Sequence, residues 1–182
     1  GGVKMSVVTV LSGSTRKKGN TDTLVQAFVR GASEHNEVEV ISVADYIIKP
    51  CDGCNYCYAD KEHRCHIGDD MQAVYEKLKH TDILVIASPI YFYGISARLK
   101  AVIDRLHNPI RSAFPIRQAV LLSVAADTLP ELFDSVLAQY HMSLRYFHIE
   151  NLGTVLVRGV EKKGDIAGNP ALDEAYRLGL SI

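Results

Sequence analysis

Short apolar runs alternate with segments of helical periodicity along most of this chain. Five runs are rich in β-branched and other apolar residues and are too short for core helices, which predicts β-strands. The five are Met5–Leu11, Val38–Val43, Ile83–Ala87, Ala119–Val124 and part of Tyr146–Val157. Because several of them are apolar at consecutive positions, both faces of their sheet are expected to be buried, as in a parallel sheet covered by helices.

Apolar residues at helical spacing separate these strands and predict five helices. The first opens at Gly19-Asn20-Thr21, and the last spans Pro170–Leu180. Between them, apolar stripes run over Met71–Leu78, Ile95–Leu106 and Phe133–Tyr140. Two of the helices have capping-box patterns at their starts. These patterns are Asp69 with Gln72 and Thr128 with Glu131.

Strands and helices that alternate along a chain indicate an α/β fold with a parallel sheet. The pattern is typical of the doubly wound, flavodoxin-like arrangement, a three-layer sandwich whose five-stranded parallel sheet has the strand order 2-1-3-4-5. We expect one domain over residues 3–182, with a cysteine-rich insertion at about residues 45–68. Ligands of such sheets bind beyond the carboxyl ends of the strands, so functional residues are expected after the first, third and fourth strands.

Hydroxyls, glycines and three cations follow the first strand, in the loop Ser12–Thr21. The loop leads into a helix, whose unpaired amides and positive end attract an anion. Ser14, Asn20 and Thr21 can donate hydrogen bonds to an anion there, and Arg16 can add a charge-assisted bond. A polar loop that only caps the helix is the alternative interpretation.

Two other nucleotide-binding loops are excluded at this position by particular residues. A Walker A loop ends in Gly-Lys followed by Ser or Thr, whereas Gly19 is followed by Asn20. A dinucleotide fingerprint needs a second glycine two residues after Gly13, where Thr15 stands.

The loop after the third strand, Ser88–Gly94, combines a proline, three aromatic residues and a glycine. Aromatic side chains offer flat faces to a ring system. Gly94 permits a close backbone approach or an unusual dihedral angle. Packing of the aromatic residues on the following helix is the alternative, but the first loop at the same edge of the sheet favours a ligand site.

The two loops together resemble the NADPH-dependent FMN reductase and iron–sulfur flavoprotein group of flavodoxin-like proteins. The resemblance rests on GSTRKKGNTDTL and SPIYFYGISARLKAVIDR, and it extends to the final GDIAGNPALDEAYRLG. It implies that one set of residues holds the FMN phosphate and that a second set lines the isoalloxazine ring. The phosphate set is Ser12, Ser14, Arg16, Asn20 and Thr21, and the ring set is Pro89, Ile90, Tyr91, Phe92 and Gly94.

The resemblance also implies that the third loop, Ser123–Asp127, approaches the other edge of the ring, with Ser123 and Asp127 as contacts. Many members of the group have glycines in this loop. This chain has Val124-Ala125-Ala126 instead, so its contacts are expected to depart from the group's pattern.

All four cysteines fall between Cys51 and Cys65, in the order Cys51, Cys54, Cys57 and, after seven further residues, Cys65. A structural zinc site usually pairs two separate Cys-x-x-Cys knuckles, whereas here the knuckles share Cys54. A thioredoxin-like dithiol needs only two cysteines and follows a first strand, not a second one. Three cysteines at this spacing plus a fourth resemble four-cysteine iron–sulfur ligation.

The same spacing resembles the iron–sulfur flavoproteins, in which such cysteines hold a 4Fe–4S cluster that exchanges electrons with FMN. The cations near the segment could offset part of the cluster's charge. These are Lys49, Lys61, Arg64 and the histidines His63 and His66. Other members of the wider group keep similar cysteines without a cluster, so plain thiols are the alternative.

Composition limits the classes of partner. The formal net charge is −1, from 20 basic and 21 acidic residues, which argues against nucleic acid because phosphate backbones need a basic face. No apolar stretch approaches the roughly 18–20 residues that span a bilayer, and the start lacks a signal-peptide pattern, so we expect a cytoplasmic protein without a membrane partner. Gly1 and Gly2 are interpreted as a remnant of cleavage.

The resemblance implies an oxidoreductase in which NAD(P)H, a transient donor, reduces FMN, and electrons pass to a quinone, another small acceptor or the cluster. Because the flavin carries the chemistry, no acid–base residue is predicted. The alternative is an iron–sulfur flavoprotein that relays electrons between protein partners. A phosphoacceptor receiver is disfavoured, since the third strand ends in Ala87-Ser88-Pro89 and not in aspartate. Relatives are dimers or tetramers, so a homodimer or homotetramer is expected.

Overall fold

A parallel sheet runs through the centre of the molecule. The computed structural model describes residues 5–182, and Gly1 and Gly2 lie outside these residues. The parallel strands lie in the order β2-β1-β3-β5-β6, which confirms the predicted order 2-1-3-4-5 when these five are numbered along the chain. Their bounds are β1 (Val7–Ser12), β2 (Glu37–Ser42), β3 (Ile83–Tyr91), β5 (Gln118–Val124) and β6 (Glu150–Val157).

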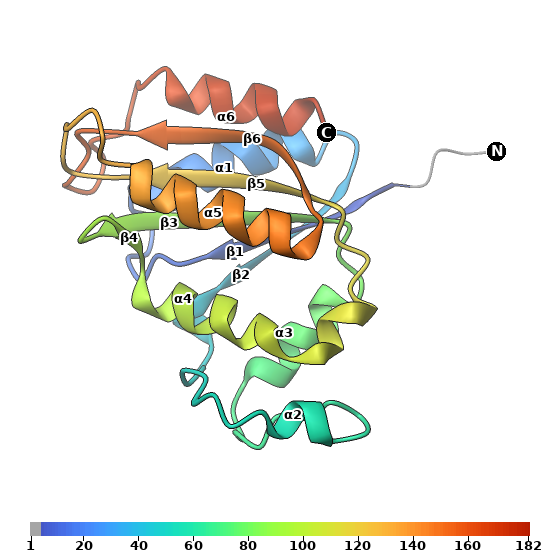
Figure 1. The fold of residues 1–182 in the computed structure, drawn as a ribbon. Helices are drawn as coiled ribbons and strands as arrows, with labels where there is room; N and C mark the ends of the chain where they lie inside the picture. The colour runs from blue at the N-terminus through green and yellow to red at the C-terminus, as the bar shows by residue number, and fades with distance from the viewer. Residues whose placement is uncertain (1–4) are drawn as a thin grey trace.

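Helices cover both faces of this sheet, which confirms the three-layer α/β arrangement (Figure 1). One face carries α1 (Asn20–Ala32) and α6 (Ala171–Leu180), and the other carries α3 (Met71–Leu78), α4 (Ala97–Asp104) and α5 (Asp134–Phe147). The shorter helices are α2 (Tyr56–Ala59), η1 (Val43–Asp45), η2 (Arg105–His107) and η3 (Pro109–Ala113). Within residues 5–182, no helix combines the length and apolar character needed to cross a bilayer.

Side chains of the central strands alternate between two cores. Val85 and Ala87 of β3 belong to the core beneath α1 and α6, whereas Leu84 and Ile86 belong to the core beneath α3, α4 and α5. The two-residue period of a strand sends successive side chains to opposite faces. A continuous apolar run in β3 therefore supplies both layers at once.

Two glycines let α1 and α6 pack closely against each other. A Cβ added at Gly31 would strike the Tyr176 carbonyl oxygen, and one added at Gly179 would strike the Phe28 carbonyl oxygen. Only hydrogen fits between backbones at this distance. The pair holds α6 against α1, the helix that follows the first predicted ligand loop.

The predicted loop Ser88–Gly94 is largely a β-hairpin, which corrects the expected strand end at Ala87. β3 continues to Tyr91 and pairs in antiparallel fashion with β4 (Gly94–Ile95). Ile95 therefore belongs to a strand, and the predicted helical stripe begins only at Ala97, in α4. The apolar residue Ile95 was assigned to the helix because it lies at helical spacing from Leu99.

Both predicted capping boxes are wrong. Asp70, not Asp69, takes the N-cap position of α3. The Asp69 carboxylate accepts from the Met71 amide, the Lys49 amide and Arg105, and Gln72 donates to Glu76 instead of closing a box. α5 begins at Asp134, six residues after Thr128. Two sets of bonds hold the chain before it in a loop. Asp127 Oδ1 accepts from the Thr128 and Leu129 amides, and Arg158 donates to the Leu129 and Pro130 carbonyls.

Candidate functional site

Three loops at the carboxyl ends of β1, β3 and β5 line one cavity of about 230 Å³. The sheet order makes these three strands neighbours, so their loops meet at one edge. The predicted residues on its wall are Ser14, Arg16, Asn20, Thr21, Pro89, Ile90 and Tyr91. Val124-Ala125-Ala126 of the third loop, with Val160 and Glu161 after β6, complete the wall.

The first loop ends at the N-terminus of α1, where Gly19 takes the N-cap position without a side-chain cap. The first amides of a helix have no acceptor within the helix and carry its positive end. Ser12, Ser14 and Thr21 are buried, and Ser12 Oγ at the end of β1 has no hydrogen-bond partner among the described residues. Ser14 and Thr21 line the cavity together with the N-cap residue Gly19, so buried hydroxyls and a positive helix end are available to an anionic ligand.

Arg16 and Asn20 also tie this loop to a segment far along the chain. Arg16 Nη1 donates to the Glu161 carbonyl at 3.0 Å, and Asn20 Nδ2 donates to the Lys162 carbonyl at 3.0 Å. Asn20 Oδ1 accepts from the Ile166 amide at 3.1 Å. Both atoms of the Asn20 amide group are thus engaged, and its side chain braces the wall of the cavity.

A polar groove of about 550 Å³ lies between α1 and β2 and shares Ser14 and Arg16 with the cavity. Ser12 lines this groove, as do Lys17, Lys18 and Arg30. The groove therefore adds positive charge close to the loop. The sequence indicated the cations of the loop, but the contribution of Arg30 depends on the packing of α1 beside β2.

The hairpin Ser88–Ile95 places strain at its tip. Phe92 and Tyr93 have φ values of 45° and 63°, in the left-handed region that side chains other than glycine rarely adopt. Gly94, expected to carry the unusual dihedral angle, is an ordinary strand residue outside the left-handed set. Phe92 is fully exposed, and neither Phe92 nor Gly94 lines the cavity, so their flavin contacts stay predictions.

Ser123 and Asp127 form hydrogen bonds within the protein itself. Ser123 is buried, and its Oγ donates to the Ser88 carbonyl at 2.8 Å across β5 and β3. Asp127 holds its own turn and accepts from Tyr93 at 3.4 Å. Neither residue lines the cavity, and their predicted ring contacts stay untested.

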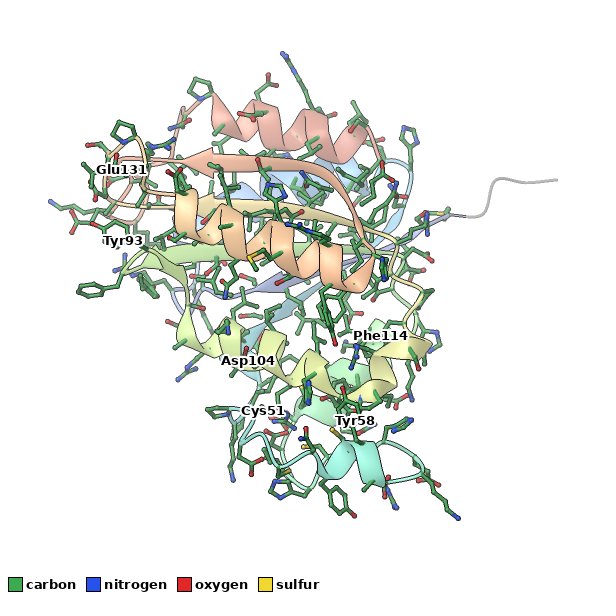
Figure 2. All side chains as sticks on the ribbon, in the orientation of Figure 1. Cys51, Tyr58, Tyr93, Asp104, Phe114 and Glu131 are labelled. Atoms are coloured by element: carbon green, nitrogen blue, oxygen red, sulfur yellow. The ribbon has the colours of Figure 1, made fainter. Side chains whose placement is uncertain are left out.

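The four cysteines line a second, small cavity of about 20 Å³ that shares no residue with the first. Figure 2 shows Cys51 and Tyr58 in the segment below α4, away from Tyr93 in the hairpin. Main-chain amides of Gly53 and Ile67 donate to the sulfurs of Cys51 and Cys65, at 3.4 and 3.5 Å. Amide bonds to sulfur are a usual feature of iron–sulfur sites.

Thiol pKa values reflect how the cysteines are grouped. Burial raises the pKa of Cys57, and the charges of the other three cysteines add to the rise. For Cys54, the Tyr56 amide lowers the pKa, but the Asp52 side chain, burial and the Cys65 charge outweigh it and leave the pKa raised. Thiolates gathered around one small cavity repel one another, so a bound cation would stabilise the four cysteines in their charged form.

Two carboxylates fix the ends of the cysteine segment. Asp69 Oδ2 accepts from the Lys49 amide at 2.8 Å, and Asp70 Oδ2 accepts from the Ile47 amide at 2.6 Å. Asp69 also forms a buried ion pair with Arg105, whose Nη1 lies 2.8 Å from Oδ2. Burial raises the pKa of Asp69, but the bonds from Arg105, Lys49 and Met71 outweigh it and hold the pKa below its usual value.

Residues after α4 brace the middle of the segment. His107 Nε2 lies 2.9 Å from Asn55 Oδ1, and Asn108 Nδ2 donates to the His63 carbonyl at 2.7 Å. Tyr58 donates to the His107 carbonyl at 3.3 Å. His107 therefore contributes to the cysteine site through contacts that only the folded structure reveals.

Asp52, Cys54 and His66 form an exposed group whose ligand atoms lie within 4.8 Å of one another. His66 Nε2 lies 2.7 Å from Asp52 Oδ2. These side chains offer a partial site for a single cation such as zinc. The other three cysteines lie outside this group, although all four share the small cavity.

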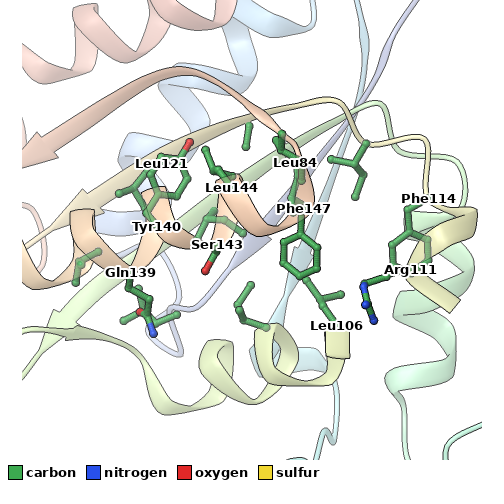
Figure 3. Close-up of a pocket in the computed structure, with 17 residues that line it drawn as sticks. Leu84, Leu106, Arg111, Phe114, Leu121, Gln139, Tyr140, Ser143, Leu144 and Phe147 are labelled. Atoms are coloured by element: carbon green, nitrogen blue, oxygen red, sulfur yellow. The ribbon is translucent and has the colours of Figure 1, made fainter. Parts of the chain in front are cut away.

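An apolar cavity of about 130 Å³ lies between α4 and α5, over β3 and β5 (Figure 3). Its walls include Leu84, Leu121, Tyr140 and Phe147, which belong to the core on this face of the sheet. No residue of the loops Ser12–Thr21 and Ser88–Gly94 lines this cavity.

The NADPH-dependent FMN reductase family model matches residues 5–160. The chain belongs to the NADPH-dependent FMN reductase family. This confirms the resemblance inferred from the two loops. The match extends from β1 past β6 and so includes the four cysteines and all of the wall of the first cavity except Glu161.

Similar proteins include two from archaea. An iron–sulfur flavoprotein of Methanocaldococcus jannaschii is 41% identical over 116 residues, which cover 63% of this chain and 58% of that protein. The chain thus spans little more than half the length of that relative. An iron–sulfur flavoprotein of Methanosarcina thermophila is 32% identical over 181 residues, which cover 94% of this chain and 87% of that protein.

A solved structure supports the fold. The NAD(P)H:quinone oxidoreductase from Methanothermobacter marburgensis superposes with a TM-score of 0.77 and 20% identity, covering 98% of this chain and 97% of that chain.

Proposed function

We propose that this protein is an FMN-dependent oxidoreductase that takes electrons from NAD(P)H and passes them to a quinone or another small acceptor. The observation that carries the proposal is the single cavity where the loops after β1, β3 and β5 meet. The family match supports the same assignment.

The residues present fit FMN. At the phosphate end, the first amides of α1 and the hydroxyls of Ser14 and Thr21 on the cavity wall would receive the phosphate, with Arg16 adding charge. The predicted contact of Ser12 would require the phosphate to reach the neighbouring groove, which Ser12 lines. At the ring end, Pro89, Ile90 and Tyr91 offer apolar and aromatic surface opposite Val124-Ala125-Ala126. The alanines leave room where larger side chains would fill the cavity.

When bound, FMN supplies the hydride and electron chemistry of the reaction. The chain's own residues anchor the phosphate, orient the ring and exclude water from its buried face. Asn20 contributes by holding the wall at Lys162 and Ile166. Predicted contacts from Phe92, Gly94, Ser123 and Asp127 would require the ring to extend beyond the cavity wall.

We further propose that Cys51, Cys54, Cys57 and Cys65 hold a 4Fe–4S cluster. All four line one cavity, and two of the sulfurs already accept main-chain amide bonds. The names of two relatives support this second centre. A protein with both centres could also relay electrons between protein partners, and this relay is the second candidate function.

A homodimer or homotetramer is part of the proposal. Three large apolar side chains are exposed on the surface of the single chain and could be covered in an assembly. They are Phe92 at the hairpin tip and Met142 and Tyr146 on α5. Light scattering after size exclusion should give twice or four times the mass of the chain, and a monomer would contradict this expectation.

FMN binding is tested first. Purified protein should be yellow or should take up added FMN with about one FMN per chain. Ser14→Ala should weaken FMN binding roughly tenfold, since it removes a hydroxyl that can donate to a charged phosphate and that also bonds the Arg16 amide and carbonyl within the loop. Ser33→Ala, at the exposed opposite end of α1, is the matched control and should bind as the parent does. Protein that takes up no FMN would overturn the proposal.

The electron donor separates the two candidate functions. Anaerobic NADPH or NADH alone should bleach the flavin rapidly if the protein is the proposed reductase. Bleaching only by a reduced ferredoxin would support the relay instead.

The cluster has its own measurement. Anaerobic protein should hold about four iron and four sulfide per chain by the four-cysteine assignment. Cys65→Ser should lose most of the iron while it retains FMN, because the two cavities share no residue. One zinc per chain and no sulfide would favour the group of Asp52, Cys54 and His66 and overturn the cluster.

A further inference from the structure

Arg105 links the end of α4 to both ends of the cysteine segment. Its Nη1 donates to the Lys49 carbonyl at 2.9 Å and to Asp69 Oδ2 at 2.8 Å, while Nη2 donates to Asp69 Oδ1 at 3.2 Å. Lys49 lies two residues before Cys51, and Asp69 lies four residues after Cys65. One buried guanidinium therefore clamps the segment where it leaves and rejoins the fold.

Further hydrogen bonds hold Arg105 and its partners in place. The Lys49 amide donates to Asp69 at 2.8 Å, and the Tyr75 hydroxyl donates to the Arg105 carbonyl at 2.5 Å. The side chains of Arg105 and Asp69 are only 2% and 1% exposed. With water excluded and both partners held, the guanidinium has little freedom to turn away.

One nitrogen of this guanidinium, Nε, is buried and makes no hydrogen bond to the described residues. Arg105 also lines the small cavity of the four cysteines, together with Tyr75 and Asn108. A buried N–H without an acceptor costs free energy. Because Arg105 lines this cavity, an acceptor that fills the cavity would be able to satisfy Nε.

Four of the five cations that the sequence suggested for charge compensation are engaged elsewhere or exposed, and the fifth, His63, lies with Nδ1 2.9 Å from the Cys57 carbonyl oxygen but does not line the cavity. Arg64 pairs with Asp60 and Glu62, and His66 pairs with Asp52. Lys49 and Lys61 are exposed. Among the described residues that line the cysteine cavity, Arg105 is the single arginine or lysine. His107 and the carboxylate of Asp52 also line this cavity.

We propose that Arg105 is a positioning residue of the four-cysteine site, which fixes the cysteine segment and provides an Nε–H donor and a positive charge to the sulfur-bound group in the cavity. This inference rests on the proposed cluster. Hydrogen bonds to sulfur and nearby charge set the potential of such clusters. A fixed positive charge stabilises the reduced form, which carries one more negative charge.

The proposal gives opposite signs for the two partners of the clamp. Asp69→Asn removes a negative charge beside the site and keeps an amide oxygen as acceptor, so reduction should become easier. Removal of Arg105 takes away the cation and the Nε donor, so reduction should become harder. A clamp with only a structural role would disturb the segment in both variants and give no such reversal.

The test uses the full chain, prepared anaerobically, with iron, sulfide and FMN measured first. Because Arg105→Met alone leaves the buried Asp69 carboxylate without its ion pair, the decisive pair is Asp69→Asn against Asp69→Asn/Arg105→Met. At a fixed potential, the double variant should have a ratio of reduced to oxidised cluster at least tenfold lower than Asp69→Asn, about 59 mV for one electron. Arg98→Met, which removes a cation from α4 outside the cysteine cavity, should stay within threefold of the parent.

Each outcome decides a separate point. Loss of iron from the double variant but not from Asp69→Asn, with FMN retained in both, supports the positioning role. A double variant that keeps four iron and titrates within threefold of Asp69→Asn overturns the role of Arg105 and leaves the cluster standing. Parent protein with FMN but without iron and sulfide overturns the cluster itself, and the inference about Arg105 with it.

Discussion

Asn20 and Ile166 lie 146 residues apart and meet through one hydrogen bond of 3.1 Å, from the Ile166 amide to Asn20 Oδ1. The same side chain donates to the Lys162 carbonyl at 3.0 Å. The loop that opens α1 is thereby joined to the segment after β6, and Val160 and Glu161 of that segment stand on the wall of the proposed FMN cavity.

Asn20→Ala should therefore affect stability and FMN binding together. It leaves the buried Ile166 amide without an acceptor, which costs about 1–3 kcal/mol of unfolding free energy. With the wall loosened, FMN should bind roughly tenfold more weakly, by the 1.4 kcal/mol that one decade of affinity represents. Urea unfolding and FMN titration measure the two effects.

Asn169→Ala is the control for this prediction. It removes an acceptor of the Ala171 amide at the start of α6, at a residue that does not line the cavity. It should lower stability by about 1 kcal/mol and leave FMN affinity unchanged. Equal loss of FMN affinity in both variants would contradict the role of Asn20.

Gly31→Ala should be strongly destabilising. The added Cβ meets the Tyr176 carbonyl oxygen and the Leu180 amide nitrogen, which belong to the backbone of α6 and can move only with the helix. We expect a loss of at least about 2 kcal/mol, measured by urea unfolding. Gly68→Ala, where nothing lies within 4 Å of the added Cβ, should change stability by less than about 0.5 kcal/mol. Similar values for the two variants would show that α1 and α6 can separate at little cost.

A change at the hairpin tip should stabilise the protein. Phe92→Asn/Tyr93→Gly places the residues that such turns favour at the two left-handed positions. Relief of the backbone strain should add about 1 kcal/mol to the unfolding free energy. FMN affinity should stay within threefold, since neither side chain lines the cavity. A large loss of affinity would instead restore Phe92 to the set of flavin contacts.

Acid should weaken the protein through Asp69. The pKa of Asp69 is lowered in the folded state, chiefly by Arg105 against the opposing effect of burial. A carboxyl with a lowered pKa stabilises the fold above its unfolded pKa of about 3.9, and this contribution is lost as the pH falls through the folded value. Near neutral pH, Asp69→Asn should cost about 3 kcal/mol because Arg105 is left without its ion pair.

The difference between parent and Asp69→Asn in unfolding free energy should shrink steadily below pH 4. Denaturant titrations at several pH values between 7 and 3 measure it. A difference that stays constant over this range would mean that Asp69 does not titrate with folding.

Much of the fold could be predicted from short-range pattern. Apolar runs such as Ile83–Ala87 predicted the central strands, because a strand buried on both faces must be apolar at every position. The strand order was correct because alternating strands and helices allow few arrangements. Helix starts were predicted less well. Asp69 and Thr128 have capping residue types, but Asp69 binds Arg105, 36 residues away, and α5 begins only at Asp134.

The sites divide in the same way. The sequence by itself determined the hydroxyls of Ser12–Thr21, the cysteine spacing and the family, because each depends on residues close together in the chain. Only the tertiary structure decided that Asn20 binds Ile166, that Phe92 stands clear of the cavity and that Arg105 closes the cysteine segment. These are contacts between distant segments, and side-chain type alone does not specify which partner a donor will meet once the sheet and its helices have packed.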